Sequence, residues 1–228
     1  MIDVVHLSKK YGNELILNDI TVQFEAGKIT GLVGANGCGK TTLMRCIIGF
    51  SKPTSGYVIV NGCLVGKKST IVHERDIPIF NQTADFAPST GMIIEEPGLL
   101  PHYSGLRNLL ILCGISGGAN KQRALDVMRI VGLDPNETKP VAKYSLGMRQ
   151  RLGIAQAIME NPSVLILDEP FNGLDNNGVS QIHELLQTLK QQGKTILLAS
   201  HSAVDIGLAC DLVYEMRAGR VFLKEVNN

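Results

Sequence analysis

The feature that most constrains the fold is a glycine-rich segment that lies between an apolar run and a helical pattern. Residues 34–41 read GANGCGKT, which matches the pattern G-x-x-x-x-G-K-[ST]. The apolar run Ile29–Val33 before it predicts a strand, and the helical spacing of residues 42–48 after it predicts a helix that ends near Gly49. A strand, a glycine loop and a helix in this order predict a phosphate-binding loop.

The residue types in this loop have a physical reason. Glycines let the backbone curl so that several N–H groups point at phosphate oxygens, and the following helix adds the positive end of its dipole. Lys40 would then reach the β- and γ-phosphates, and the Thr41 hydroxyl would hold Mg²⁺. The alternative is a glycine-rich turn without a ligand, and the loop alone does not separate NTPases from kinases. The residues expected to surround the nucleotide are Gly34, Ala35, Asn36, Gly37, Cys38, Gly39, Lys40, Thr41 and Thr42.

A second candidate site lies where the apolar run 164–167 ends in Asp168 and Glu169. Unpaired buried carboxylates are costly, so a buried strand seldom ends this way unless the charges face a site. Asp168 suits an outer-shell role at Mg²⁺, and Glu169 stands where a general base would polarise an attacking water. The alternative is that the pair only caps the turn at Pro170.

The remaining pattern indicates an α/β core with an inserted helical lobe. Short apolar runs at 164–167 and 195–199 are typical of parallel strands buried on both faces, and helical spacing at 179–191 predicts a βαβ unit. From about 97 to 160 the pattern is mostly helical and forms the lobe, so the chain 1–228 is predicted to be one domain. Further predictions are strands at 20–24 and 57–60, helices at 106–115, 120–131 (capped by Asn120) and 145–158, and a hairpin of 212–216 with 221–224.

With these motifs in place, the chain resembles the ATP-binding cassette (ABC) family over nearly its whole length. Residues 144–151, YSLGMRQR, are similar to the family's LSGGQ signature, and residues 172–175, NGLD, are similar to its D-loop. His201 resembles the switch histidine, and Tyr11 resembles the aromatic residue that stacks on adenine. Each also has a plainer interpretation: Ser145 as a helix N-cap, His201 as a structural histidine and Tyr11 as an exposed loop residue.

The resemblance implies a fold and a set of roles. The fold is an α/β P-loop NTPase core with a mixed parallel sheet, an antiparallel β subdomain and the inserted helical lobe. ATP and Mg²⁺ are the expected cofactors, and ATP hydrolysis is the expected reaction. The implied roles are catalysis for Glu169 and His201, ATP binding for Tyr11 and residues 34–42, contact with a partner's ATP for Ser145, Gly147 and Met148, D-loop function for Asp175, and metal binding for Thr41, Glu95 and Asp168.

The same resemblance implies partners and a location. A second ATP-binding subunit, expected to be an identical copy, would complete two ATP sites, and a transmembrane permease would contact the region 97–103. The protein would then be cytoplasmic and peripheral on the cytoplasmic face of the cell membrane. No apolar run reaches the roughly 20 residues that cross a bilayer, so membrane work would need such a partner. The first residues predict no secretory signal.

Glu95 stands where the family usually has glutamine, at the join between the core and the lobe. A carboxylate can still bind Mg²⁺ or water, but it adds negative charge near Glu169. Because like charges at close range raise the pKa of one of the two carboxyl groups, we expect the activity of this site to depend on pH differently from a site with glutamine. A shift of one residue in the alignment would exchange Glu95 with Glu96. The arrangement of Glu before Pro97 resembles ABC ATPases of peptide-antibiotic and bacteriocin immunity.

Other departures lie in the signature and in the connection 62–95. Leu146 and Met148 replace residues of the usual signature, although Gly147 remains. The connection is longer than in typical relatives by about a dozen residues, with segments 66–68 and 87–89 that look like loops.

Composition weighs against other classes. The net charge is +1, from 22 basic and 21 acidic residues, so no nucleic-acid partner is expected. The five cysteines have no metal-ligand spacing and predict reduced thiols. A soluble ABC ATPase that acts on ribosomes or nucleic acid stays as the alternative, although such proteins usually carry two cassettes, a charged linker or a coiled coil. An unrelated P-loop kinase would not explain the signature and His201.

Overall fold

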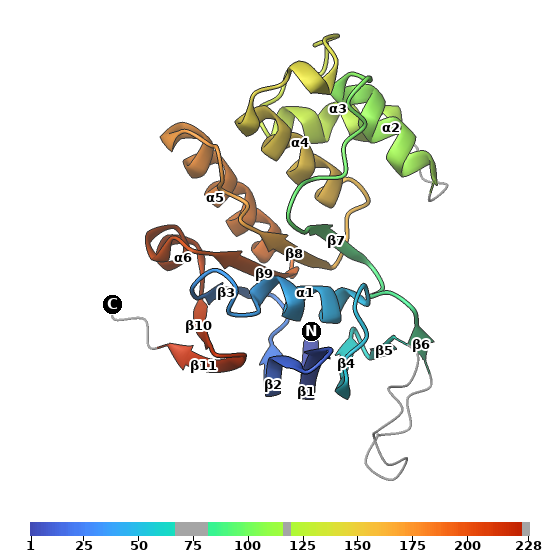
Figure 1. Ribbon diagram of the computed structural model, residues 1–228. Helices are drawn as coiled ribbons and strands as arrows, with labels where there is room; N and C mark the ends of the chain where they lie inside the picture. Colours follow the sequence, from blue (N-terminus) through green and yellow to red (C-terminus); the bar gives the residue numbers. More distant parts are fainter. Residues whose placement is uncertain (67–81, 116–119, 225–228) are drawn as a thin grey trace.

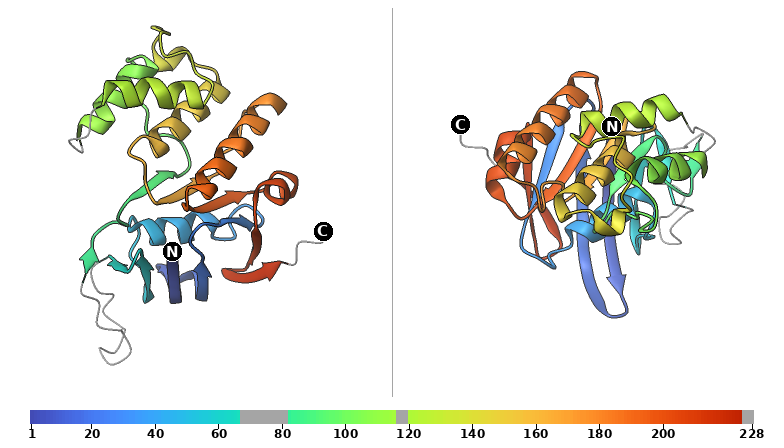
Figure 2. Two further views of the ribbon diagram at one scale, coloured as in Figure 1. Left: turned by 180° about the vertical axis from the view of Figure 1, so that it is seen from behind. Right: turned by 90° about the horizontal axis from the view of Figure 1, so that it is seen from above.

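The computed structural model describes residues 1–66, 82–115 and 120–224, which form two β-sheets with helices around them (Figure 1). Helix α1 lies between the two sheets, and α2, α3 and α4 stand together beyond β7 and β8 (Figures 1 and 2). The strands are β1 (Ile2–Tyr11), β2 (Glu14–Phe24), β3 (Ile29–Val33), β4 (Ser55–Val60), β5 (Cys63–Val65), β6 (Thr83–Ala84), β7 (Thr90–Ile93), β8 (Val164–Asp168), β9 (Thr195–Ser200), β10 (Leu212–Arg217) and β11 (Arg220–Lys224). The helices are α1 (Lys40–Ile48), α2 (Gly105–Ile115), α3 (Lys121–Ile130), the 3₁₀ turn η1 (Val141–Lys143), α4 (Leu146–Ile158), α5 (Asn176–Gln191) and α6 (Ala203–Ala209).

The larger sheet has the order β11-β10-β3-β9-β8-β7 and carries the candidate site. Every neighbouring pair is parallel except the β10–β11 hairpin, so the sheet is mixed as predicted. Strands β8 and β9 pair in register from Val164 with Thr195, and α5 connects them, which confirms the predicted βαβ unit. Parallel neighbours bring the carboxyl ends of β3, β8 and β9 to one edge of the sheet.

The smaller sheet has the order β2-β1-β4-β5-β6. It is antiparallel as expected except for its last pair, because β5 and β6 run parallel. Strand β1 has no counterpart among the predicted strands. Register shifts between Val4 and Lys10 interrupt its pairing with β2, and such irregularities break the alternation that would otherwise reveal a half-buried strand.

The core has one hydrophobic cluster on each face of the larger sheet, and β8 contributes to both. Val164 and Ile166 pack with α1 and the smaller sheet, whereas Leu165 and Leu167 pack with the helices on the other face. All four side chains are fully buried. This packing explains the uninterrupted apolar run of β8, because both of its faces are removed from water.

Between β7 and β8 the chain forms α2, α3, η1 and α4, in the region where the sequence predicts helices. The Asn120 side chain caps α3 by accepting a hydrogen bond from the N–H of Arg123, and the Ser145 hydroxyl caps α4 by accepting one from Met148. Both caps are confirmed. We call α2, α3 and α4 the helical lobe.

The five cysteines are free thiols, as predicted. Across the described residues no cluster of His, Cys, Asp and Glu has the composition of a metal site, and no helix is long and apolar enough to span a bilayer. Of the connection 62–95, residues 87–89 are a loop as predicted, while residues 67 and 68 lie outside the described part.

Candidate nucleotide-binding site

The glycine-rich loop joins β3 to α1 at the carboxyl edge of the larger sheet. Gly39 caps α1 with φ at 112°, and a Cβ on it would lie 2.7 Å from the Met216 side chain and 3.0 Å from that of Leu17. Gly37 also has a positive φ, of 78°. The turn therefore needs glycine at these two positions, for conformation at both and for space at Gly39.

The Lys40 side chain is folded over the loop and is 7% exposed. Its Nζ donates hydrogen bonds to the carbonyl oxygens of Gly34 at 2.7 Å and Ala35 at 3.2 Å. The ammonium group is thus held at the mouth of the loop, where it completes a ring of donors formed by the loop and the first turn of α1.

Thr41 and Asp168, which the sequence places far apart, are in direct contact. The Thr41 hydroxyl donates a hydrogen bond of 2.7 Å to Asp168 Oδ2. Burial raises the pKa of Asp168, the hydrogen bond from Thr41 opposes this, and the negative charges of Glu169 and Glu95 add to the rise. The contact brings together two oxygen atoms that can act as metal ligands, as binding of a divalent cation would require.

The Glu169 carboxylate connects the ends of β8 and β9. Its Oε2 accepts a hydrogen bond of 3.0 Å from the Ser200 hydroxyl, and its Oε1 accepts one of 2.9 Å from the backbone N–H of His201. The His201 Nδ1 also lies 2.9 Å from Oε1, so the two residues predicted to be catalytic touch each other. The His201 side chain is 68% exposed, which leaves its other ring nitrogen open to solvent.

Ser200 is a partner of Glu169 that was not predicted from the sequence. Ser200 is the last residue of β9 and is 2% exposed, so its side chain is fixed against the end of β8. Its only signal in the sequence is a polar residue that ends an apolar run, directly before His201.

The glycine-rich loop, Asp168 and Glu169 line a cleft with a volume of ≈ 480 Å³. Ile16 lines it without having been predicted, together with Asn172 of the D-loop and Glu96, the neighbour with which Glu95 could exchange. The predicted Gly34, Ala35, Cys38 and His201 are not part of the lining within the described chain. The complete lining is Tyr11, Ile16, Asn36, Gly37, Gly39, Lys40, Thr41, Thr42, Glu95, Glu96, Asp168, Glu169 and Asn172.

Glu95 has an ion-pair partner that the sequence did not indicate. Its Oε2 lies 2.9 Å from Arg45 Nη2, with the two side chains 60% and 40% exposed. Arg45 is in the last turn of α1 and offsets the charge that Glu95 brings to the cleft. Because both side chains reach solvent, water screens this pair.

Tyr11 lies at the rim of the cleft and is 49% exposed. Its hydroxyl is 3.2 Å from Ser51 Oγ, and Lys9 Nζ lies 4.7 Å from its ring centroid. The contacts with Lys9 and Ser51 restrain the ring, and half of its surface stays available for stacking.

Apart from Asn172, the signature and D-loop residues are not part of this cleft within the described chain. Ser145 caps α4, and Met148 packs partly buried against the core. Asp175 caps α5 by accepting a hydrogen bond of 2.9 Å from Gly178. Gly147 lies against the D-loop, because a Cβ on it would be 2.7 Å from the carbonyl oxygen of Gly173.

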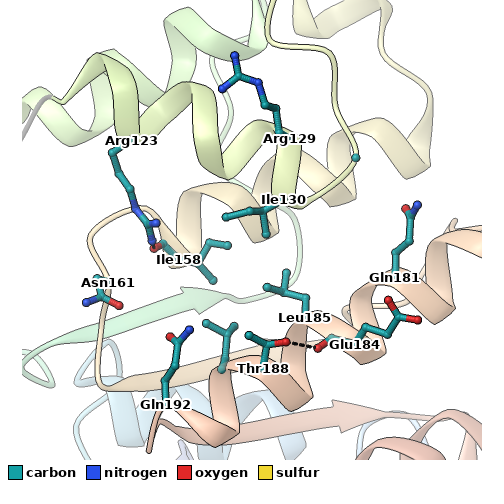
Figure 3. A pocket seen from close by; sticks show the side chains of 12 residues that line it. Arg123, Arg129, Ile130, Ile158, Asn161, Gln181, Glu184, Leu185, Thr188 and Gln192 are labelled. Atoms are coloured by element: carbon teal, nitrogen blue, oxygen red, sulfur yellow. Dashed lines mark hydrogen bonds between the residues drawn. The ribbon is translucent and has the colours of Figure 1, made fainter.

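A larger cleft, with a volume of ≈ 700 Å³, lies between the helical lobe and α5 and contains none of the predicted motifs (Figure 3). Ile130, Ile158 and Leu185 point into it, while Arg129 points away. The guanidinium group of Arg123 donates hydrogen bonds to the carbonyl oxygens of Ile158 and Met159 at the end of α4. We therefore place the chemistry in the smaller cleft, where the charged and motif residues converge.

Comparison with known proteins gives consistent results. A family model described as "ABC transporter" matches residues 17–172. The chain is 41% identical to the uncharacterized ABC transporter ATP-binding protein YybJ of Bacillus subtilis (99% of this chain, 96% of YybJ). It is 38% identical to the bacitracin transport ATP-binding protein BcrA of Enterococcus faecalis (100% and 69%) and 33% identical to the lantibiotic transport ATP-binding protein SrtF of Streptococcus pyogenes (99% and 90%).

Solved structures agree on the fold. A dimeric post-hydrolysis state of the ATP-binding cassette MJ0796 bound to ADP and Pi has a TM-score of 0.82 at 22% identity and full coverage of both chains. A structure described as the ATP binding subunit of an ABC transporter has a TM-score of 0.80 at 27% identity and covers 97% of this chain and 88% of that one. The family model ends at residue 172, so Asp175 and His201 lie beyond its match.

Proposed function

The chain belongs to the ABC transporter family as an ATP-hydrolysing, ATP-binding subunit, and from that premise we propose how its residues bind ATP, complete a second site and act on a membrane partner. The observation that carries the proposal is the convergence of the glycine-rich loop, Asp168 and Glu169 at one cleft, with His201 in contact with Glu169. A phosphate loop next to an oriented carboxylate is what hydrolysis of a nucleotide triphosphate requires.

In our proposal the loop N–H groups and Lys40 bind the phosphates of ATP. Lys40 would exchange its acceptors at Gly34 and Ala35 for phosphate oxygens of the same hydrogen-bonding type. Tyr11 would stack on the adenine at the rim of the cleft. The α1 dipole and the ammonium charge both favour the anionic phosphates.

The Thr41 and Asp168 oxygens fit Mg²⁺, which prefers hard oxygen ligands and often keeps several of its waters. Thr41 would bind the ion directly and Asp168 through water, with Glu95 in reach of the same cleft. When bound, Mg²⁺ neutralises phosphate charge. The raised pKa of Asp168 fits this role, because a buried carboxylate lacking a cation favours its proton.

Glu169 is the proposed general base. Ser200 and the N–H of His201 fix its carboxylate, so that it can accept a hydrogen bond from the attacking water. It would take up the proton of that water as the water oxygen bonds to the γ-phosphorus and the bond from this phosphorus to the bridging oxygen breaks, which releases ADP. His201 would contact the γ-phosphate through the ring edge that faces solvent, while its Nδ1 stays on Glu169.

A second copy of the chain would complete each site. Ser145 and Gly147 lie at the start of α4, where backbone N–H groups can bind an anion, but they do not line this chain's own described cleft. In a head-to-tail pair, Ser145, Gly147 and Met148 of one copy would meet the ATP held by the other, with Asp175 near the junction. Separation of the copies after hydrolysis would drive the partner.

The proposed permease contact lies beside β7 and α2. A groove with a volume of ≈ 340 Å³ is lined there by Met92, Leu112 and Cys113 among others. Next to it along the chain, Phe86 forms an edge-to-face pair with Phe50, with ring centroids 5.9 Å apart, and both side chains are more than half exposed. Exposed aromatic side chains of this kind favour protein contact. The region 97–103, where Tyr103 is 47% exposed, would extend this surface.

Such a contact would place the subunit peripherally on the cytoplasmic face of the cell membrane. The relatives named for bacitracin and lantibiotic transport favour a peptide antibiotic as the cargo. The near-neutral charge gives no support to a nucleic-acid or ribosome partner. Copurification separates these possibilities, since a membrane protein supports the proposal and ribosomes or DNA would contradict it.

The catalytic assignment is tested with Glu169→Gln. We expect ATP binding to be retained and turnover to fall at least about a hundredfold, because a base in proton transfer typically contributes 10²–10⁴-fold. The variant should also form an ATP-dependent dimer in size-exclusion chromatography. Glu184→Gln, an exposed carboxylate on α5, is the control and should hydrolyse ATP normally. Normal turnover by Glu169→Gln would show that Glu169 is not the base.

A further inference from the structure

The buried side chain of Gln150 contacts the backbone of the proposed base. Gln150 lies in α4 and is 6% exposed. Its Nε2 donates a hydrogen bond of 3.1 Å to the carbonyl oxygen of Glu169. The same carbonyl accepts a second hydrogen bond of 3.2 Å, from the N–H of Asn172. The helical lobe therefore reaches the catalytic strand end through a side-chain amide.

This contact acts on a backbone that is held in an unfavourable conformation. Glu169 has φ at 50°, in the left-handed region that non-glycine residues rarely adopt. Its N–H donates to the carbonyl oxygen of Ala199 at 2.8 Å, so both sides of the residue are tied down. Such a conformation persists only where surrounding contacts enforce it, and it is often found at functional sites.

The carbonyl and the carboxylate of Glu169 are fixed from different directions. Ser200 and His201 hold the carboxylate from β9, whereas Gln150 holds the carbonyl from α4. Rotation of the backbone would move the carboxylate away from its β9 partners. Gln150 thereby restricts the directions that the base can take.

A second contact between α4 and this segment lies one turn earlier in the helix. Gly147 approaches so closely that a Cβ on it would be 2.7 Å from the carbonyl oxygen of Gly173. The segment 169–173 is thus held by α4 at both of its ends. Because Ser145 caps the same helix, the residue proposed to meet the partner's ATP and the residue that holds Glu169 share one rigid element.

We propose that Gln150 is a positioning residue for ATP hydrolysis, which holds Glu169 in its reactive backbone conformation through the hydrogen bond to its carbonyl oxygen. The proposal rests on the proposed role of Glu169 as general base. Gln150 itself touches neither ATP nor the attacking water in this scheme, so its loss should affect turnover and spare nucleotide binding.

The test is Gln150→Met, which keeps the length of the side chain and removes its donor. We expect kcat for ATP to fall at least tenfold while KM stays within twofold of the wild type. The matched control is Gln187→Met, because Gln187 Nε2 donates a similar hydrogen bond of 3.0 Å to the carbonyl oxygen of Ala209, far from the cleft. Loss of stability alone would lower the activity of both variants. Wild-type kcat in Gln150→Met, or equal losses in the two variants, would overturn the proposal.

Two further measurements separate loss of positioning from loss of folding. Gln150→Asn withdraws the amide by one methylene but stays polar, so it should show the same selective fall in kcat if Gln150→Met folds poorly. In single-turnover experiments on the Glu169→Gln background, Gln150→Met should cause no further loss, since the base on which it acts is already absent. An additive loss there would contradict the proposal. Absence of hydrolysis in the wild type would instead refute the proposed function.

Discussion

Replacing Gly173 by alanine tests the contact between the signature and the D-loop, and the structure gives two separate costs. Gly173 has φ at 74°, and an alanine in the left-handed region costs about 1–2 kcal/mol. Its Cβ would also lie 2.4 Å from Cγ and 2.6 Å from Cδ2 of Leu146, and overpacking of this kind costs about 1–3 kcal/mol. Gly173→Ala should therefore destabilise the protein by about 2–5 kcal/mol.

The overpacking cost comes from the Leu146 side chain and can be removed separately by shortening that side chain. The Leu146 side chain is 49% exposed, so Leu146→Ala alone should cost about 1 kcal/mol or less. In the double variant the clash with Cγ and Cδ2 disappears, although the Leu146 Cβ at 3.1 Å remains close. We expect the double variant to be more stable than Gly173→Ala, with a coupling of about 1–3 kcal/mol.

Gly193 provides the matched control. It has φ at 81°, but a Cβ on it would meet nothing within 4 Å, so Gly193→Ala carries the conformational cost without the clash. Its cost should not depend on Leu146. The measurement is a double-mutant cycle of unfolding free energies from urea titration. Additivity of Gly173→Ala and Leu146→Ala within about 0.5 kcal/mol would refute the argument.

Three further outcomes follow from the charges and rings around the cleft. Because the pKa of Asp168 is raised above its usual 3.8, ionisation of this carboxyl lowers the free energy of unfolding of the nucleotide-free protein as the pH rises above that value. In thermal melts with a chelator, Asp168→Asn should therefore be more stable than the wild type at neutral pH, and this gain should vanish below about pH 3.8. Since the charge of Glu95 contributes to the raised pKa of Asp168, Glu95→Gln should move the acidic limb of the pH–rate profile to lower pH and preserve nucleotide binding. Glu96→Gln is the control, and an unchanged profile in Glu95→Gln would show that Glu95 and Asp168 are not coupled by charge. Tyr11→Ala should raise the KM for ATP roughly two- to thirteenfold by removing a ring contact of about 0.5–1.5 kcal/mol, whereas Tyr11→Phe should not.

The local part of the site was predictable because its residues are neighbours in the sequence. The loop 34–41 combines glycines, a lysine and a threonine at fixed spacing, and each is required for local geometry or charge. The run that ends in Asp168 and Glu169 is similarly explicit, because two carboxylates directly follow four apolar residues. Burial on both faces of β8 explains that run, and the structure supplies the contact of Asp168 with Thr41.

The contacts that cross the fold were not predictable in the same way. Strand β1 was missed because its bulges disturb the period on which strand prediction depends. Arg45 lies 50 residues before Glu95, and Gln150 lies 19 residues before Glu169. No spacing rule connects such pairs, since their distance depends on how α1 and α4 pack against the sheet.

The Arg45–Glu95 pair shows how such a contact changes an inference. From the sequence, a glutamate in place of glutamine adds a full negative charge beside the phosphates. In the structure an arginine lies 2.9 Å from that carboxylate, so the pair as a whole is neutral. Both side chains are 40% or more exposed, which means that solvent also weakens their effect on Asp168. The effect of Glu95 on the pH–rate profile should therefore be larger in an Arg45→Met background than in the wild type, and an equal shift in both would show that Arg45 does not offset the charge.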